Sequence, residues 1–251
     1  MHIDEMLELF RERYSRRDRL CFPYGLHELL QLMGLSVAKL NRSIRQNDPP
    51  EIAQARLADA VAWLCAVVNH FYDLPFAEAF TAKYGGMECP YCGERTCICD
   101  PKDRPEAGRI TFETIPAGSH GKTIDWWCHH LDIIFGPRNR EEGIYRVVVH
   151  LIEEMNEVLS LTSLAIFEIN DLEELERQFA LELADILAHL IAIANLKKIE
   201  LALAIQERYG NCCPECKKES CRCPRLMIAG NRAQRISSVS QNFVLSKEKK
   251  G

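Results

Sequence analysis

Residues 180–196 read ALELADILAHLIAIANL. The polar side chains in this run are Glu182, Asp185, His189 and Asn195, which follow one another at steps of three, four and six residues. An α-helix repeats every 3.6 residues, so these four side chains project from one side of an otherwise apolar helix. A helix of this kind is buried almost all round. With apolar residues at helical spacing along the rest of the chain, it predicts an all-α fold.

The whole chain has the composition of a globular protein. It contains 251 residues, of which 47% are hydrophobic and 27% charged, enough to bury a core. The net charge of −5 argues against nucleic acid or anionic lipid as the main partner. We expect no membrane span, because polar residues interrupt the longest apolar run, 179–196. The acidic N-terminus MHIDEMLELF is unlike a secretory signal, so we expect a cytoplasmic protein.

A cysteine pattern occurs twice. The pattern consists of Cys-Pro-x-Cys, then four residues, then Cys-x-Cys. It begins at Cys89 and again at Cys213, an offset of 213 − 89 = 124. Upstream, Leu57-Ala58-Asp59 matches Leu183-Ala184-Asp185, Asn69 matches Asn195, and Lys83-Tyr84-Gly85 matches Arg208-Tyr209-Gly210. We therefore predict a tandem duplication with a boundary near residue 122, where a stretch rich in proline and glycine interrupts the helical pattern. Residues 1–122 are called the first half below, and residues 123–251 the second half.

Each half is predicted to contain three main helices followed by a cysteine knuckle. In the first half the helices are expected at 3–16, 24–46 and 50–84, the last interrupted near Leu74-Pro75. In the second half they are expected at 123–135, 141–165 and 172–209, with possible breaks near Thr162 and Lys197. A short strand is expected at most at 110–115, between the halves.

The carboxylates of the second half favour a metal site. Buried acids need a cation, a proton or a basic partner. Glu153, Glu154 and Glu157 lie on the helix before Glu182 and Asp185, so two neighbouring helices present the hard oxygen ligands that Mg²⁺ takes. The alternative is ordinary structure: solvated Glu153 and Glu154, a basic partner for Glu157, and an isolated Asp185 with its hydrogen bonds satisfied.

This pattern resembles a known family. Glu153-Glu154-Met155-Asn156-Glu157, followed by Glu182-Leu183-Ala184-Asp185, is similar to the E-E-x-x-E … E-x-x-D signature of the MazG-like, all-α nucleoside triphosphate pyrophosphohydrolases. The resemblance covers residues 123–210. It implies that Glu154, Glu157, Glu182 and Asp185 bind catalytic Mg²⁺ with support from Glu153, and that an NTP or dNTP is cleaved to NMP and pyrophosphate. It also implies that His189, Asn195 and Lys198 bind the nucleotide, and that Trp63, Asn69 or Lys83 of the first half contacts the base or the phosphates. The alternative is that Trp63 and Asn69 are only core and helix-contact residues.

The first half departs from this signature. Glu182 corresponds to Arg56 and His189 to Trp63, and the helix that carries the glutamates in the second half has no acid at 32–37. Arg56 and Asp59 are expected to pair with each other. Family sites are completed by a second protomer, so the first half is interpreted as a degenerate partner in a pseudo-dimer; a homodimer is the other possibility. A duplicated fold that has lost one site is also compatible with a non-catalytic nucleotide-sensing or binding scaffold.

The two knuckles are interpreted as zinc sites. Four thiolates within eleven residues can surround one tetrahedral Zn²⁺, and a site closed by four protein ligands is structural. Iron–sulfur clusters, exchange of ligands between the two knuckles, and reversible disulfides are the alternatives. The predicted ligands of the two sites are Cys89, Cys92, Cys97 and Cys99, and Cys213, Cys216, Cys221 and Cys223.

Overall fold

The computed structural model describes residues 1–21, 25–71, 74–99, 121–167 and 172–223. Within these ranges the chain forms eight α-helices and no β-strand, which confirms the all-α prediction. The expected strand at 110–115 lies outside the described residues. The helices are α1 (Ile3–Cys21), α2 (Leu26–Gln46), α3 (Pro50–Val68), α4 (Phe76–Tyr84), α5 (Ile124–Glu142), α6 (Ile144–Phe167), α7 (Leu172–Lys197) and α8 (Leu201–Tyr209).

The predicted interruptions near Pro75 and Lys197 are confirmed, and two other boundaries were wrong. Helix α5 continues past Phe135 and through Pro137, because Ile134, Phe135 and Asn139 are buried and this packing offsets the missing N–H of the proline. It ends at Gly143, whose positive φ of 82° turns the chain into α6. Helix α6 runs to Phe167 without the break expected near Thr162, whose hydroxyl donates a hydrogen bond to the Leu159 carbonyl oxygen.

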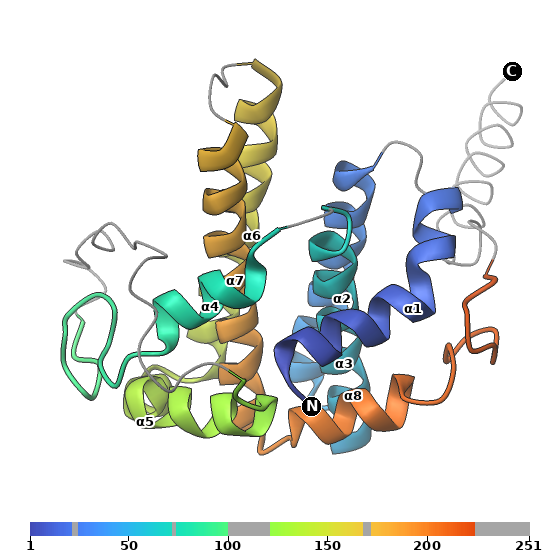
Figure 1. Ribbon diagram of the computed structural model, residues 1–251. Coiled ribbons are helices and arrows are strands. Elements are labelled where there is room, and N and C mark those ends of the chain that lie inside the picture. Colours follow the sequence, from blue (N-terminus) through green and yellow to red (C-terminus); the bar gives the residue numbers. More distant parts are fainter. Residues whose placement is uncertain (22–24, 72–73, 100–120, 168–171, 224–251) are drawn as a thin grey trace, which may run out of the picture.

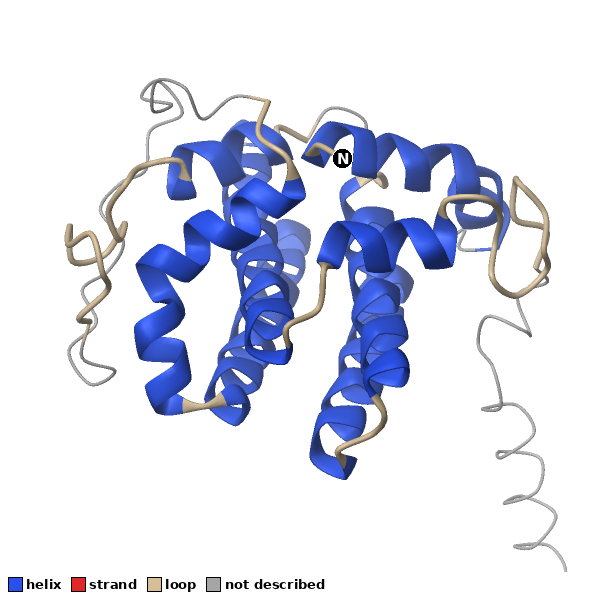
Figure 2. Cartoon of the chain, turned by 90° about the horizontal axis from the view of Figure 1, so that it is seen from below, coloured by secondary structure: helices blue, strands red, loops and turns tan. Residues whose placement is uncertain are grey.

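Two pairs of long helices form the body of the molecule. Helices α2 and α3 make one pair, and α6 and α7 make the other. Helix α1 packs against α3 and α5 packs against α7. Figure 2 shows the two long pairs standing next to each other, joined by direct contact between α3 and α7.

The short helices pack on the opposite half. Helix α4 belongs to the first half by sequence, yet it lies against α7 (Figure 1). Helix α8 belongs to the second half and lies against α3. The buried apolar residues of both halves form one contiguous core, so the two halves are packed as a single unit.

Among the described helices, α7 alone could cross a membrane by length and composition. This applies to residues 173–197, but 67% of the most apolar stretch of the helix is buried inside the protein. The core helix of a globular domain has the same properties, so this finding is weak support for a membrane span.

Candidate metal centre

Three of the predicted metal ligands converge. Glu154 and Glu157 lie one turn apart on α6 and meet Glu182 from α7, and one carboxylate oxygen of each lies within 4.8 Å of the others. Glu154 is buried, with 6% of its surface exposed, whereas Glu157 is exposed and Glu182 is intermediate. The cluster therefore extends from the core to the surface and can be reached from solvent.

The surroundings of the cluster disfavour its negative charge. Burial, followed by repulsion from Asp185, Glu157 and Glu182, raises the pKa of Glu154 to about 9. Burial and the charge of Asp185 raise the pKa of Glu182 to about 8. Solvation of Glu154, one of the alternatives to a metal site, was wrong. At neutral pH without a metal, these two carboxyls hold protons that a divalent cation can displace.

Asp185 is held by two residues of the first half. Its Oδ2 lies 2.5 Å from Lys83 Nζ, and its Oδ1 accepts a hydrogen bond of 2.5 Å from Tyr84 Oη. Asp185 and Lys83 are both buried, so this is a buried ion pair. Both carboxylate oxygens of Asp185 thus have protein partners. Sequence reasoning did not assign Tyr84, although its match to Tyr209 in the repeat could have pointed to it.

The other acid and the histidine predicted for this site flank the cluster. Glu153 is exposed, and its Oε2 lies 2.6 Å from His150 Nδ1. His189 Nδ1 lies 2.9 Å from the carbonyl oxygen of Asp185, and because a carbonyl only accepts, this nitrogen donates. The His189 ring lies 6.0 Å from the His150 ring, so the two histidines border the same end of the cluster.

The remaining predicted substrate residues lie elsewhere. Asn195 donates a hydrogen bond of 2.8 Å to the Cys128 carbonyl oxygen and lines a separate surface pocket with Lys198. Ten helical residues separate Asn195 from Asp185, a distance of about 15 Å along the axis of α7. Trp63 and Asp59 line a different cavity, which lies between the first half and the end of the second half. The structure therefore does not gather His189, Asn195, Lys198 and Trp63 around one substrate.

The first half makes matching contacts around Asp59. Tyr209 Oη donates a hydrogen bond of 2.6 Å to Asp59 Oδ1, as Tyr84 does to Asp185. Arg208 donates hydrogen bonds of 2.5 and 3.1 Å to the two carboxylate oxygens of Asp59. It is therefore the basic partner of Asp59, as Lys83 is the basic partner of Asp185. The predicted Arg56–Asp59 pair is confirmed, with 3.6 Å between Arg56 Nη1 and Asp59 Oδ2.

Both cysteine knuckles are preorganised. The four sulfurs of Cys89, Cys92, Cys97 and Cys99 lie within 4.8 Å of one another, and so do those of Cys213, Cys216, Cys221 and Cys223. None of these cysteines forms a disulfide. The hydrogen bond from Cys89 lowers the pKa of Cys97 to about 5, and that from Cys221 lowers the pKa of Cys213 to about 4, while the same bonds raise the pKa of Cys89 and of Cys221. Such thiolates are what a soft metal ion requires.

Each knuckle, like each short helix, is attached to the other half. The Cys97 amide donates a hydrogen bond of 2.8 Å to the Ile134 carbonyl oxygen on α5. The Cys221 amide donates one of 2.8 Å to the Arg13 carbonyl oxygen on α1. The Arg13 side chain also donates to the carbonyl oxygens of Gly210, Asn211 and Glu219.

Comparison of the chain with protein-family models, curated proteins and solved structures found no match.

Proposed function

We propose that this protein is a Mg²⁺-dependent nucleotide pyrophosphohydrolase, which cleaves an NTP or dNTP to NMP and pyrophosphate. The observation that carries the proposal is the convergence of Glu154, Glu157 and Glu182 within 4.8 Å at a solvent-accessible position. The reaction itself comes from the resemblance of these residues and Asp185 to the MazG-like signature. Three hard oxygen donors at one position fit Mg²⁺, which completes its shell with waters and substrate phosphates.

In this proposal the four acids have different roles. Glu154, Glu157 and Glu182 hold the cation, which when bound neutralises charge on the phosphate oxygens. Lys83 and Tyr84 hold Asp185 beside the cluster, where its charge acts on both Glu154 and Glu182. Glu153 positions His150, and His189 borders the site where the rest of the nucleotide would lie.

The matched contacts support an intrachain pseudo-dimer. Asp59 and Asp185 occupy equivalent sequence positions, and each is bonded by a tyrosine and a basic residue from the other half. We infer that two copies of an ancestral bundle exchange their terminal helices and knuckles within one chain, and that the knuckles bind structural Zn²⁺. A cytoplasmic location remains a prediction.

A non-catalytic, nucleotide-sensing scaffold is the second candidate. The Lys83–Asp185 ion pair favours it, because this pair neutralises one of the four signature acids without a metal. The two candidates differ in turnover, since a scaffold binds nucleotide without cleaving it.

The deciding experiment uses the full-length, zinc-replete protein, a panel of NTPs and dNTPs, and Mg²⁺, with products resolved by chromatography. An enzyme yields monophosphate and pyrophosphate, and Glu157→Gln or Glu182→Gln lowers turnover by roughly 100-fold or more because an essential ligand charge is lost. Glu174→Gln is the matched control, since Glu174 lies on α7 outside the cluster and pairs with Arg177. No turnover of any nucleotide by the folded protein would favour the scaffold.

Glu157→Gln is a better test than Asp185→Asn. Removing the Asp185 charge leaves Lys83 buried without its partner, a change that costs about 3–5 kcal/mol in proteins. Loss of activity in Asp185→Asn would therefore report unfolding as readily as chemistry, whereas Glu157 is exposed and a neutral glutamine relieves repulsion.

A further inference from the structure

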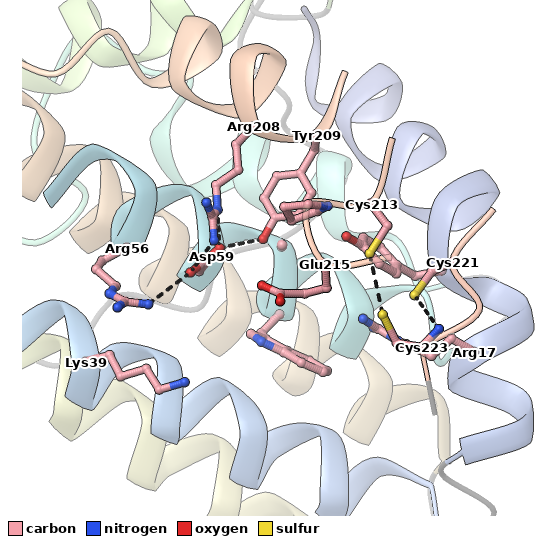
Figure 3. Close-up of a pocket in the computed structure, with 14 residues that line it drawn as sticks. Arg17, Lys39, Arg56, Asp59, Arg208, Tyr209, Cys213, Glu215, Cys221 and Cys223 are labelled. Carbon is pink, nitrogen blue, oxygen red and sulfur yellow. Dashed lines mark hydrogen bonds and ion pairs between the residues drawn. The ribbon is translucent and has the colours of Figure 1, made fainter. Parts of the chain in front are cut away.

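A cavity of about 280 Å³ lies where the two halves meet, between α1, α2 and α3 of the first half and α8 and the knuckle of the second half. Four basic side chains line it, one from each of these helices: Arg17, Lys39, Arg56 and Arg208. Figure 3 shows Arg56 and Lys39 on one side of the cavity and the cysteine sulfurs of the second knuckle on the other. Two acids, Asp59 and Glu215, also line it, so the lining groups carry a positive balance.

The four basic groups are not equally engaged by acids. Arg208 is fully engaged with Asp59, and Arg17 pairs with Asp18 at 2.5 Å. Arg56 reaches Asp59 only at 3.6 Å, and its side chain is 40% exposed. Lys39 is exposed at the mouth of the cavity. Arg56 and Lys39 are therefore the cations most available to an incoming anion.

Aromatic rings form another wall. The Arg17 guanidinium lies 4.0 Å from the Tyr14 ring centroid and 4.6 Å from the Trp63 ring centroid. Cation–π contacts with both rings hold this guanidinium in place, with 8% of the residue exposed. The cavity therefore places a fixed positive charge beside two aromatic rings.

Two residues that line the cavity correspond, in the repeat, to two of the acids predicted to bind metal in the second half. Asp59 in its wall is the counterpart of Asp185, and Arg56 stands where the second half has Glu182. The same place in the two halves thus carries an acidic cluster in one and a basic cavity in the other. A site that attracts cations has its counterpart in a site that attracts anions.

We propose that this cavity binds a small phosphate-bearing aromatic ligand, of the nucleoside monophosphate class, through Lys39 and Arg56 and without a divalent cation. The phosphate meets the two cations at the mouth, and the rest of the ligand lies toward Tyr14 and Trp63. The volume is at the lower edge of small-molecule pockets, about 300–1,000 Å³, which fits a ligand of this size. The inference does not depend on hydrolysis at the acidic cluster.

Glu215 opposes this binding. It belongs to the second knuckle and is exposed, and Figure 3 shows it in the middle of the cavity lining in this view. Its carboxylate competes with an incoming phosphate for the same positive field. Neutralising it therefore strengthens binding, an effect opposite to that of removing a lining cation.

The test is calorimetric titration of the full-length protein with AMP, ribose 5-phosphate and adenosine, in buffer without added Mg²⁺. We expect saturable binding of AMP, weaker binding of ribose 5-phosphate, and weaker binding of adenosine. The double variant Lys39→Ala, Arg56→Ala lowers AMP affinity by about 10-fold or more, because two phosphate contacts are lost. Glu215→Gln raises it several-fold.

Two controls locate the ligand. Arg42→Ala removes an exposed cation one turn from Lys39 on α2 that does not line the cavity, and it leaves the affinity unchanged. Glu157→Gln, in the acidic cluster, also leaves it unchanged. The proposal is overturned if AMP does not bind, if adenosine binds as tightly as AMP, if the double variant binds normally while its melting temperature is unchanged, or if Glu157→Gln abolishes binding.

Discussion

Glu154 lies in surroundings that destabilise the ionised form of its carboxyl group. Its side chain is buried on α6 against three other acids, and Lys83, the cation among the groups acting on it, is already bonded to Asp185. A proton or a metal ion must therefore accompany it in the folded state. If the cluster holds Mg²⁺ as we propose, the affinity for the ion and the dependence of that affinity on pH have the same cause.

The stability of the Mg²⁺-free protein should fall as pH rises. The folded pKa of Glu154 is about 9 and that of Glu182 about 8, both above the unfolded value of 4.5, so the folded state binds more protons between these limits. Stability is highest below pH 4.5 with respect to these groups and is lost as pH approaches 9. We expect the melting temperature to decline between about pH 5.5 and 8.5, and added Mg²⁺ to raise it more at about pH 8.5 than at about pH 6.

Thermal denaturation of Glu154→Gln checks this cause. The amide does not titrate, so the decline becomes shallower, while Glu174→Gln keeps the slope of the original protein. An identical slope in Glu154→Gln would mean that another group is responsible.

At the scale of elements, the knuckles connect the halves. The second knuckle is held to α1 by the Cys221 amide and by the Arg13 side chain, which reaches three carbonyl oxygens. Because closed sites with four cysteine ligands contribute folding energy, removal of their metal should lower the melting temperature and not merely inhibit an intact fold.

Arg13→Met should weaken the second knuckle. The thioether keeps the apolar bulk of the side chain but donates no hydrogen bond to Gly210, Asn211 or Glu219. The measurement is the rate at which zinc passes from the protein to a chromogenic chelator. If loss of these contacts destabilises the second knuckle by roughly 1.4 kcal/mol, the zinc ion of that knuckle should transfer about 10-fold faster, while the ion of the first knuckle should transfer at the original rate. Arg11→Met, on the exposed face of α1, should leave transfer unchanged. Equal rates in both variants would contradict the prediction.

The elements were predictable to the extent that they depend on local pattern. The spacing of apolar residues predicts helix α7, and the helix is present. The repeated Cys-Pro-x-Cys motif predicts two cysteine clusters, and these are present as well. The extension of α5 through Pro137 was not predictable, because it depends on burial against other helices. The role of Tyr84 and the positions of Asn195 and Trp63 depend on which helix packs on which, and spacing along one helix does not contain that information.

At the scale of the molecule, the exchanged contacts predict that neither half is stable alone. Residues 1–122 without the second half lose Arg208 and Tyr209 as partners of Asp59 and expose the surface of α3 that α8 covers. Residues 123–251 alone lose Lys83 and Tyr84 and expose α7. Each fragment therefore loses ion-pair and hydrogen-bond partners and exposes apolar helix surface to water, and both changes are costly.

Expression of the two fragments tests this expectation. Separately, each should be aggregated or lack a cooperative thermal transition, and together they should copurify as a one-to-one complex with restored helicity. A cooperative transition in either fragment alone would show that the exchange is not needed for folding.

The contacts between the two halves also determine when the chain can complete its fold during synthesis on the ribosome. The ion pair between Asp59 and Arg208 can form only after Arg208 has been synthesised, 149 residues later in the chain. At about 5–20 residues per second the delay is about 7–30 s, long compared with the folding of a small helical bundle. During that interval α3 lacks its cover, and a nascent neighbour carrying the same sequence can offer an α8 in its place. Crowded polysomes would therefore favour interlocked chains, and slower initiation of translation should increase the yield of monomer.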